Sequence, residues 1–331
     1  MDKVTPILKE NSKIIFDTIK SNLEIISPDN LQEASLYLTE AGGKMLRPNL
    51  TLIVSQAVGG DKESTLDAAA AIELIHTFSL IHDDIMDADD IRRGKPAVHK
   101  VWDESVAILA GDTLFSKSFE IIANSSGENV SVAQKNQALA TVADACVKIC
   151  EGQASDMSFE GNFQVKEEEY MEMIFKKTGA LIAAATKVGA IIGGAEQEVI
   201  DAMYDYGKLI GLAFQIQDDY LDVISNEEDL GKPVGSDIVE GKMTLMVVKA
   251  LSQADDADSE RLINILKNPE SSQSEVDEAI SLFNKYGSIE YAQNVAHENV
   301  NKAKELLEIL PESEYKTSLQ LIADFVLNRK S

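Results

Sequence analysis

Two copies of one carboxylate pattern, Asp-Asp-x-x-Asp, are the residues of this chain whose types and spacing best suit chemistry. They are Asp83-Asp84-Ile85-Met86-Asp87 and Asp218-Asp219-Tyr220-Leu221-Asp222. On an α-helix the first and last Asp of each copy lie one turn apart and about 40° apart around the axis, so they share a face. Paired carboxylate oxygens suit Mg²⁺, which keeps several waters and usually shares a substrate phosphate. The two motifs therefore predict magnesium-binding positions.

The sequence before each motif is long and mostly apolar, over residues 74–82 and 206–217. Neither segment resembles a solvated acidic helix face. Carboxylates at the end of an apolar helix must be hydrated, paired or metal-bound, because burying a bare carboxylate is very costly. A single motif of this length could be a charged helix end without catalytic meaning. Two copies in the same surroundings favour the metal-binding interpretation.

The elements that position these motifs are predicted to be helices, and the fold class to be all-α. Apolar residues recur at spacings of three and four along almost every segment, and strand-like alternation is nearly absent. Ser27-Pro28 predicts an N-cap followed by proline at the first helical position, and Asp61 to Glu63 predicts the start of the helix that leads to the first motif. Thr178-Gly179 predicts a break in a helix that begins after Gln164.

Composition limits the organisation and the partners. The chain has 331 residues, is 44% hydrophobic and contains no Pro/Gly/Ser-rich linker, which predicts a single domain over residues 1–331. Its formal net charge of −26 argues against nucleic acid or an anionic membrane as a partner, since both require a basic surface. An acidic protein that handles anionic substrates needs cations to mediate the contact.

The cysteines and the N-terminus predict a cytoplasmic protein. Cys146 and Cys150 are the only cysteines, and no second Cys or His cluster accompanies them, so a zinc site is not expected. We expect both to be buried core thiols in a reducing compartment. Met1-Asp2-Lys3-Val4 begins no signal-peptide apolar stretch, and no run of roughly 18 apolar residues predicts a membrane span.

Neutral polar and cationic residues occur close to both motifs. His76 lies seven residues before Asp83 on the same helical stripe, and Gln215 lies three before Asp218. Lysines and arginines are scarce in this chain, yet several lie near glycine. They are Lys44, Arg47, Arg92, Arg93, Lys176, Lys177, Lys232 and Lys242. Arg suits bidentate phosphate binding, while Lys supplies a point charge.

In combination, these segments resemble the trans-type, short-chain isoprenyl diphosphate synthases of the polyprenyl synthetase family. The resemblance runs from Gly42 to about Thr244, contains both motifs in order, and includes the segment Gly152-Gln153-Ala154-Ser155-Asp156. It shows no departure at a functional position, and beyond residue 250 it depends on helical character alone. It implies one large helical bundle around a central cavity, with the two motifs facing each other across its mouth, and usually a homodimer.

The resemblance also implies residue roles. Isopentenyl diphosphate would be held by Lys44, Arg47, His76 and Arg93. The diphosphate of the allylic substrate (dimethylallyl, geranyl or farnesyl diphosphate) would be held by Arg92, Lys177 and Lys242, with Lys232 closing over it. About three Mg²⁺ ions would neutralise this leaving group. Their main ligands would be Asp83, Asp87 and Asp218, and Asp84, Asp219 and Asp222 would contribute directly or through water.

The chemistry implied is prenyl transfer through an allylic cation. Loss of the stabilised diphosphate leaves the cation, which the amide oxygen of Gln215 and carbonyls near Lys177 and Thr178 would stabilise while water is excluded. The double bond of isopentenyl diphosphate then attacks, and a proton is lost, in this family to the departing diphosphate. The product is an allylic diphosphate that is longer by one isoprene unit.

Product length is expected to depend on Phe78 and Ser79, five and four residues before Asp83. In the resembling family an aromatic residue followed by a small one at these positions is typical of archaeal-type enzymes that make geranylgeranyl diphosphate, sometimes with farnesyl diphosphate. Five residues of helix span about 7.5 Å, close to one isoprene unit. An ideal helix places Phe78 about 140° from Asp83, so this assignment comes from the resemblance, and Phe78 as an ordinary core residue is the alternative.

Two other functions share part of the pattern. A class I terpene cyclase uses the same ionisation and an aspartate-rich first motif, but it normally has a different second metal motif and needs no second diphosphate site. A non-catalytic subunit of a prenyl synthase tends to lose metal ligands or cations, and this chain keeps all of them.

Overall fold

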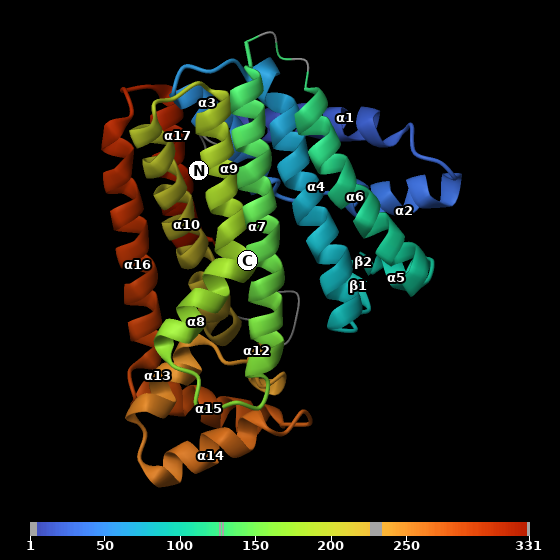
Figure 1. Ribbon diagram of the computed structural model, residues 1–331. Helices are drawn as coiled ribbons and strands as arrows, with labels where there is room; N and C mark the ends of the chain where they lie inside the picture. Colours follow the sequence, from blue (N-terminus) through green and yellow to red (C-terminus); the bar gives the residue numbers. More distant parts are fainter. Residues whose placement is uncertain (1–4, 126, 128, 226–233, 330–331) are drawn as a thin grey trace. The chain divides into compact units, whose positions relative to one another are not determined.

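The computed structural model of the protein describes residues 5–125, 127, 129–225 and 234–329, which are mainly helical (Figure 1). The only strands in this part of the chain are β1 (Ile91–Arg92) and β2 (Lys95–Pro96), which pair antiparallel with Arg92 opposite Lys95. The predicted all-α class is confirmed. Lys232, which was expected to close over substrate, lies outside the described residues.

The chain divides into two compact units. The first comprises Met1–Cys146, Leu181–Tyr204 and Leu307–Leu321, and the second comprises Val147–Ala180, Asp205–Leu306 and Ile322–Ser331. The first Asp-rich motif therefore belongs to the first unit and the second motif to the second unit. The prediction of a single domain stays a prediction.

The first unit contains the N-terminal helices, the short hairpin and parts of later helices. Its elements are α1 (Thr5–Leu23), α2 (Asp29–Glu40), α3 (Leu46–Ala57), α4 (Lys62–Met86), α5 (Val98–Val101), α6 (Glu104–Asn124), α9 (Ala180–Ile192) and the 3₁₀ turn Leu307–Ile309. The first residue of α9, Ala180, already belongs to the second unit, and three further helices also contribute residues to both units: α7 (Val132–Phe159), α10 (Gln197–Ile224) and α17 (Glu314–Asn328).

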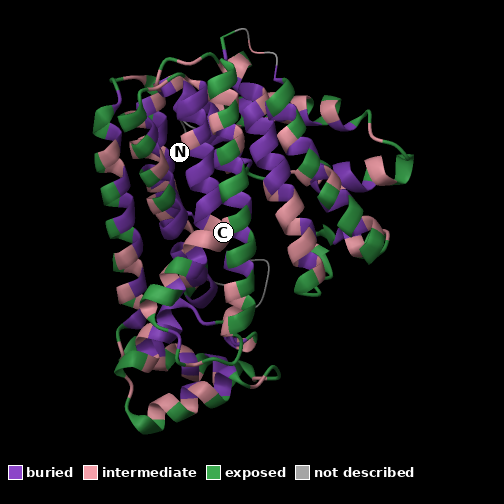
Figure 2. Cartoon of the chain, viewed as in Figure 1, coloured by how far each residue is buried: buried purple, intermediate pink, exposed green. Residues whose placement is uncertain are grey.

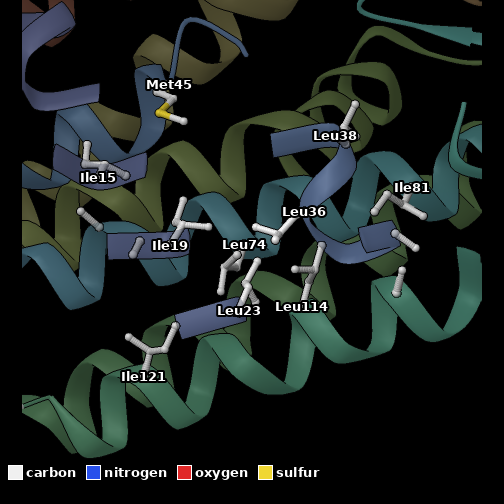
Figure 3. Packing of buried hydrophobic residues seen from close by; sticks show 14 of the residues in the cluster. Ile15, Ile19, Leu23, Leu36, Leu38, Met45, Leu74, Ile81, Leu114 and Ile121 are labelled. Carbon is white, nitrogen blue, oxygen red and sulfur yellow. The ribbon is translucent and has the colours of Figure 1, made fainter. Parts of the chain in front are cut away.

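The core of the first unit lies between α1, α2, α4 and α6 (Figure 3). Ile19 of α1, Leu38 of α2, Leu74 of α4 and Leu114 of α6 are essentially inaccessible to solvent. Burying each such side chain contributes roughly 1.5–3 kcal/mol. Ile81 belongs to the same cluster two residues before the first motif, so core packing fixes the end of α4 that carries the acids.

The start of α4 follows the prediction. Asp61 is its N-cap, and the Asp61 carboxylate accepts a 2.9 Å hydrogen bond from the Ser64 backbone N–H. By length and composition alone α4 could cross a membrane, but 67% of its most apolar window is buried inside the protein, as in the core helices of globular proteins. The start of α2 differs by one residue from the prediction, because Pro28 is the N-cap and Asp29 begins the helix.

The second unit contains a π-helical turn and the C-terminal helices. Its elements are α8 (Glu167–Ile174), the π turn η1 (Phe175–Gly179), α12 (Ser236–Val239), α13 (Leu245–Gln253), α14 (Asp256–Leu266), α15 (Gln273–Lys285) and α16 (Ser288–Leu306). The predicted helix break at Thr178-Gly179 is therefore wrong in form, because the chain continues through the π turn into α9.

Burial along the helices follows the expected periodicity, and it explains why the two cysteines differ in exposure. In Figure 2, α9 is buried along most of its length, whereas α16 alternates between buried and exposed positions. Cys146 is buried as predicted, but Cys150 is exposed. The buried stripe of α7 passes through Ile149 and Gln153, and Cys150 lies one residue to its side.

Candidate active site

The first Asp-rich motif occupies the C-terminal end of α4. Asp83 is partly exposed and Asp87 exposed, whereas Asp84 is buried. The helix ends when Ala88 adopts a left-handed conformation (φ 55°) and the Asp89 N–H bonds to the Asp84 carbonyl at 2.9 Å. The C-terminal end of a helix carries partial negative charge, which adds to the charge of the carboxylates. This position favours a bound cation.

Asp84 differs in role from Asp83 and Asp87, because its carboxylate binds the guanidinium of Arg92. Arg92 Nε donates to Asp84 Oδ1 at 2.6 Å, and Arg92 Nη2 donates to Asp89 at 2.9 Å. Burial raises the pKa of Asp84, and the hydrogen bond and charge of Arg92 oppose that rise. The buried Asp84 thus fixes the Arg92 guanidinium, on which the charge of the partly exposed Asp83 also acts.

The β1–β2 hairpin separates Arg92 from Arg93. Its two turn residues, Arg93 and Gly94, both have positive φ (54° and 72°), as a type I′ turn requires. While Arg92 contacts Asp84, Arg93 Nη1 donates to the carbonyl oxygens of Leu38, at 3.1 Å, and of Gly42. The hairpin therefore places Arg92 against acidic side chains and Arg93 against backbone carbonyl groups.

Arg93 belongs to a second cationic cluster with Arg47 and His76. Arg47 Nη1 donates to His76 Nε2 at 3.3 Å. Burial, followed by the charges of Arg47, Arg93 and Arg92, lowers the pKa of His76 well below its usual value, so the ring is neutral and accepts this bond. Burial also lowers the pKa of Arg47 to about 10. Three of the four residues predicted to bind isopentenyl diphosphate thus lie together.

The fourth predicted residue, Lys44, is exposed in the loop that surrounds Arg93. A Cβ on Gly43 would lie 3.0 Å from the Arg93 guanidinium carbon, so a side chain there would crowd the arginine. Met45 then takes a left-handed conformation (φ 44°) before α3 begins. A glycine at position 43 is therefore explained by its close approach to the Arg93 side chain.

Sequence reasoning missed Glu73, an acid of this cluster. Glu73 is 2% exposed, and its Oε1 lies 4.0 Å from Arg93 Nη2. Burial raises its pKa to about 7, although Arg93 and Arg47 oppose the rise. A single carboxylate within the apolar run of residues 68–75 was the signal in the sequence.

The second motif occupies the C-terminal end of α10 and repeats the division between exposed and anchored acids. Asp218 is exposed, whereas Asp219 and Asp222 are buried. Asp222 accepts hydrogen bonds from Ser236 Oγ at 2.7 Å and from the Asp237 N–H at 3.0 Å. Its carboxylate thus caps the start of α12, a structural role that the sequence did not indicate.

Asp219 is held by two donors. Tyr170 Oη donates at 2.7 Å and Gln215 Nε2 at 2.9 Å, and Thr178 Oγ1 donates to Gln215 Oε1 at 2.8 Å. Burial and the charge of Asp237 raise the pKa of Asp219 to about 8, against the effect of the two hydrogen bonds. The structure therefore links Thr178, Gln215 and Asp219 in one chain, and Tyr170 is an anchor that the sequence reasoning missed.

Asp218 contacts a cation from the end of the chain. Arg329 Nη2 lies 3.0 Å from Asp218 Oδ1 and donates to the Phe214 carbonyl at 2.8 Å. The guanidinium also lies 3.9 Å from the centre of the Phe214 ring, a distance typical of a cation–π contact. Arg329 was not among the predicted site residues, because the resemblance carried no motif so late in the chain.

Close approaches between helices explain the π turn that carries Lys177 and Thr178. A Cβ on Gly152 of α7 would lie 2.2 Å from the backbone nitrogen of Lys177. A Cβ on Gly211 of α10 would lie 2.5 Å from the Gly179 Cα. Glycines at these positions let the backbones meet. Single π turns occur often at functional sites, and Lys177 uses this one to contact Asp156.

Lys242 follows α12 and is surrounded by acids. It lies 3.6 Å from Asp237 and also contacts Glu240. Burial opposes a rise in its pKa, but Asp237 and Glu240 raise it above its usual value. Lys242 therefore keeps its charge at any physiological pH.

Phe78 lies in an aromatic row on α4 and α6. Its ring contacts His82 and Phe115 edge-on at centroid distances of 5.1 and 5.2 Å, and Phe115 contacts Phe119 at 5.1 Å. The neighbouring Ser79 hydroxyl bonds back to the His76 carbonyl at 2.9 Å. Phe78 and Ser79 thus lie on the helix that carries the first motif, while their role in product length stays a prediction.

The acids fit magnesium that is shared with a substrate. Among the described residues, no three His, Cys, Asp or Glu side chains gather closely enough to hold a metal ion by themselves. Mg²⁺ does not require such a group, since it commonly takes one or two carboxylates together with substrate phosphates and water. The partly exposed Asp83 and the exposed Asp87, at a helix C-terminus, would fit such a donor set.

The chain is similar to known prenyl synthases over its full length. The family model "Polyprenyl synthetase" matches residues 28–283. The short chain isoprenyl diphosphate synthase of Methanothermobacter thermautotrophicus is 59% identical over 331 residues, covering 100% of both chains. The geranylgeranyl diphosphate synthase of Methanosarcina mazei is 45% identical, covering 98% of this chain and 97% of that one. The geranylfarnesyl diphosphate synthase of Natronomonas pharaonis is 40% identical, covering 99% and 98%.

Solved structures agree with these relatives. The crystal structure of geranylgeranyl pyrophosphate synthetase from Pyrococcus horikoshii matches with a TM-score of 0.94 at 46% identity, covering 99% of each chain. A polyprenyl synthase from Caulobacter crescentus, crystallised with calcium and isoprenyl diphosphate, matches with a TM-score of 0.88 at 31% identity, covering 100% and 98%. The chain therefore belongs to the polyprenyl synthetase family and is a prenyltransferase of the isoprenyl diphosphate synthase type.

Proposed function

We propose that the protein condenses isopentenyl diphosphate with dimethylallyl, geranyl or farnesyl diphosphate in the presence of Mg²⁺, and releases geranylgeranyl diphosphate, farnesyl diphosphate or both. The observation that carries this proposal is that each Asp-rich motif combines accessible and anchored acids. Asp83, Asp87 and Asp218 are accessible at helix C-termini, while Asp84 and Asp219 are buried and held by hydrogen bonds.

The allylic diphosphate would be bound by the accessible acids through metal ions and by cations directly. About three Mg²⁺ would act as Lewis acids on the leaving diphosphate. Arg92, Lys177 and Lys242 would contact its oxygens. Each of these cations already pairs with a carboxylate of the protein, so its head group is oriented before substrate arrives.

Isopentenyl diphosphate would be bound by the separate cluster of Lys44, Arg47, His76 and Arg93. The neutral His76 ring accepts from Arg47 and so orients its guanidinium. Two guanidiniums that share one buried acid retain an excess of positive charge, which favours a diphosphate. This second anion site distinguishes a synthase from a terpene cyclase.

The hydrogen-bonded series Thr178–Gln215–Asp219 supports a role of Gln215 in stabilising the allylic cation. The Gln215 amide is fixed at both ends, since its oxygen accepts from Thr178 and its nitrogen donates to Asp219. A fixed amide oxygen with a remaining lone pair is polarisable but not nucleophilic. The proton lost after carbon–carbon bond formation would leave with the diphosphate.

The proposal extends to assembly and location. The homodimer that the family resemblance implies is part of the proposal, and the exposed Ile108 and Leu109 of α6 (44% and 54%) are apolar side chains that such an interface could cover. The acidic charge and the burial of α4 support a cytoplasmic protein.

The function is tested with labelled isopentenyl diphosphate and each allylic starter in turn. Chromatography of the dephosphorylated products should show prenyl alcohols of the farnesyl and geranylgeranyl lengths. Incubation with farnesyl diphosphate and Mg²⁺ alone is the control, because a released hydrocarbon would instead identify a cyclase. Activity that required a second polypeptide would identify a non-catalytic subunit.

A further inference from the structure

Glu73 is an acid in an otherwise apolar part of α4. Its neighbours Ile72 and Leu74 are completely buried, and Glu73 itself is 2% exposed. One of its carboxylate oxygens, Oε2, is buried without a hydrogen-bond partner among the described residues. A carboxylate in this position is unfavourable unless nearby charge compensates it.

Two arginines from different elements supply that charge. Arg47 comes from the first turn of α3, and Arg93 comes from the β1–β2 turn, with Nη2 4.0 Å from Glu73 Oε1. These are the two charges that act on Glu73, and the charge of Arg93 also lowers the pKa of Arg47. His76, one turn later on α4, is neutral and bonds to Arg47. Glu73 is therefore the counter-ion that lets the two arginines stay together without a ligand.

A bound diphosphate would take over this role. It would pair with Arg47 and Arg93 and bring negative charge toward a carboxylate that is already buried. We infer that Glu73 is a positioning residue for the isopentenyl diphosphate site, and that its carboxylate takes up one proton from solvent when Arg47 and Arg93 bind a diphosphate. This inference rests on the function proposed above, which places a diphosphate at these arginines.

The electrostatics of the free protein are compatible with such uptake. Burial already raises the pKa of Glu73 to about 7. The carboxylate is therefore mostly ionised at pH 8 before binding and mostly protonated at pH 6, where little uptake is expected. The pH dependence of binding should consequently appear above pH 7.

Isothermal titration calorimetry measures the uptake directly. Isopentenyl diphosphate is titrated into the full-length protein at pH 8, in two buffers of different ionisation enthalpy and with chelator present to exclude metal-linked protons. The wild type should take up about 0.9 proton more than Glu73→Gln at pH 8, and the difference should fall to about 0.1 proton at pH 6. Above pH 7 the Kd of the wild type should rise by about tenfold per pH unit relative to the variant.

Controls separate this inference from the proposed function. Glu120→Gln removes an exposed acid of α6 that pairs with Lys117, and its proton uptake should equal that of the wild type. Inorganic diphosphate is titrated in parallel because it requires only the cations. Proton uptake with inorganic diphosphate, but no prenyl transfer in any assay, would leave the role of Glu73 intact and overturn the proposed function.

Equal proton uptake by the wild type and a folded Glu73→Gln variant would overturn the inference. If that variant does not fold, infrared difference spectra of the wild type provide the readout. The stretch of a protonated, buried carboxyl group should appear on addition of diphosphate at pH 8. Its absence would equally overturn the inference.

Discussion

The hydroxyl of Tyr170 donates a 2.7 Å hydrogen bond to Asp219, and both side chains are buried. This contact joins α8 to the second Asp-rich motif and fixes an acid beside the exposed Asp218. Removing a group that orients a metal ligand from behind typically lowers metal affinity by about 10- to 100-fold.

Tyr170→Phe should therefore raise the Mg²⁺ concentration needed for half-maximal activity by about 10- to 100-fold. The matched control is Tyr286→Phe, since Tyr286 also donates a 2.7 Å bond to an aspartate, Asp258, outside the candidate site. Magnesium titrations of prenyl transfer check the prediction. An unchanged activation curve for Tyr170→Phe would remove this residue from the metal site.

Arg92→Gln should destabilise the protein because Asp84, which is 1% exposed, would lose its cation. Removing one partner of a buried pair typically costs about 3–5 kcal/mol of unfolding free energy. The double variant Arg92→Gln/Asp84→Asn should recover part of this loss, because no buried charge remains. Urea unfolding measures both effects.

Arg261→Gln is the control for that experiment. Its pair with Glu278 is exposed, and exposed pairs contribute at most about 1 kcal/mol. Equal destabilisation by Arg92→Gln and Arg261→Gln would contradict the anchoring role of Asp84.

Glu73 should make stability depend on pH. Its pKa is raised from 4.5 to about 7 in the folded protein, so its contribution to stability is fully present below pH 4.5 and is lost as the pH rises to 7. The unfolding free energy of the wild type relative to Glu73→Gln should fall by about 3 kcal/mol over this interval. Parallel pH profiles of the two proteins would contradict the raised pKa.

Phe78→Ala should lengthen the products. The change removes the first ring of the row Phe78, Phe115 and Phe119, and Phe78→Ala/Phe115→Ala should lengthen them further. Phe163→Ala is the control, because Phe163 contacts Lys267 in the other unit. Chromatography of the products decides, and an unchanged distribution would make Phe78 an ordinary core residue.

Local sequence features predicted the helices and the acid pairs. The spacing of Asp83 and Asp87 requires only helical geometry, and the Asp61 cap requires only a carboxylate three residues before a free N–H. Such features involve neighbours in sequence, so no knowledge of tertiary contacts is needed. The all-α class could be predicted for the same reason, because the spacing of apolar residues along a helix is also a local feature.

Features that depend on distant residues were not predictable from the sequence. Glu73 is explained by Arg47 and Arg93, which lie on other elements, and the π turn at Thr178 is explained by glycines of two other helices. The sequence predicted an irregularity at Thr178-Gly179, and the structure has one there. It is a π turn and not a helix break, because packing against Gly152 keeps the chain helical. The hydrogen bond from Ser236 to the buried Asp222 also joins residues that are distant in sequence.

The central claim is that Asp83 and Asp87 gather magnesium around an allylic diphosphate so that its carbon–oxygen bond can break. The most direct test measures consumption of dimethylallyl diphosphate with isopentenyl diphosphate while free Mg²⁺ is varied, for the wild type and Asp83→Asn/Asp87→Asn. The account predicts turnover that disappears in excess chelator, returns with Mg²⁺, and falls by several orders of magnitude in the double variant. Turnover that persisted in chelator, or that survived in the double variant, would contradict it.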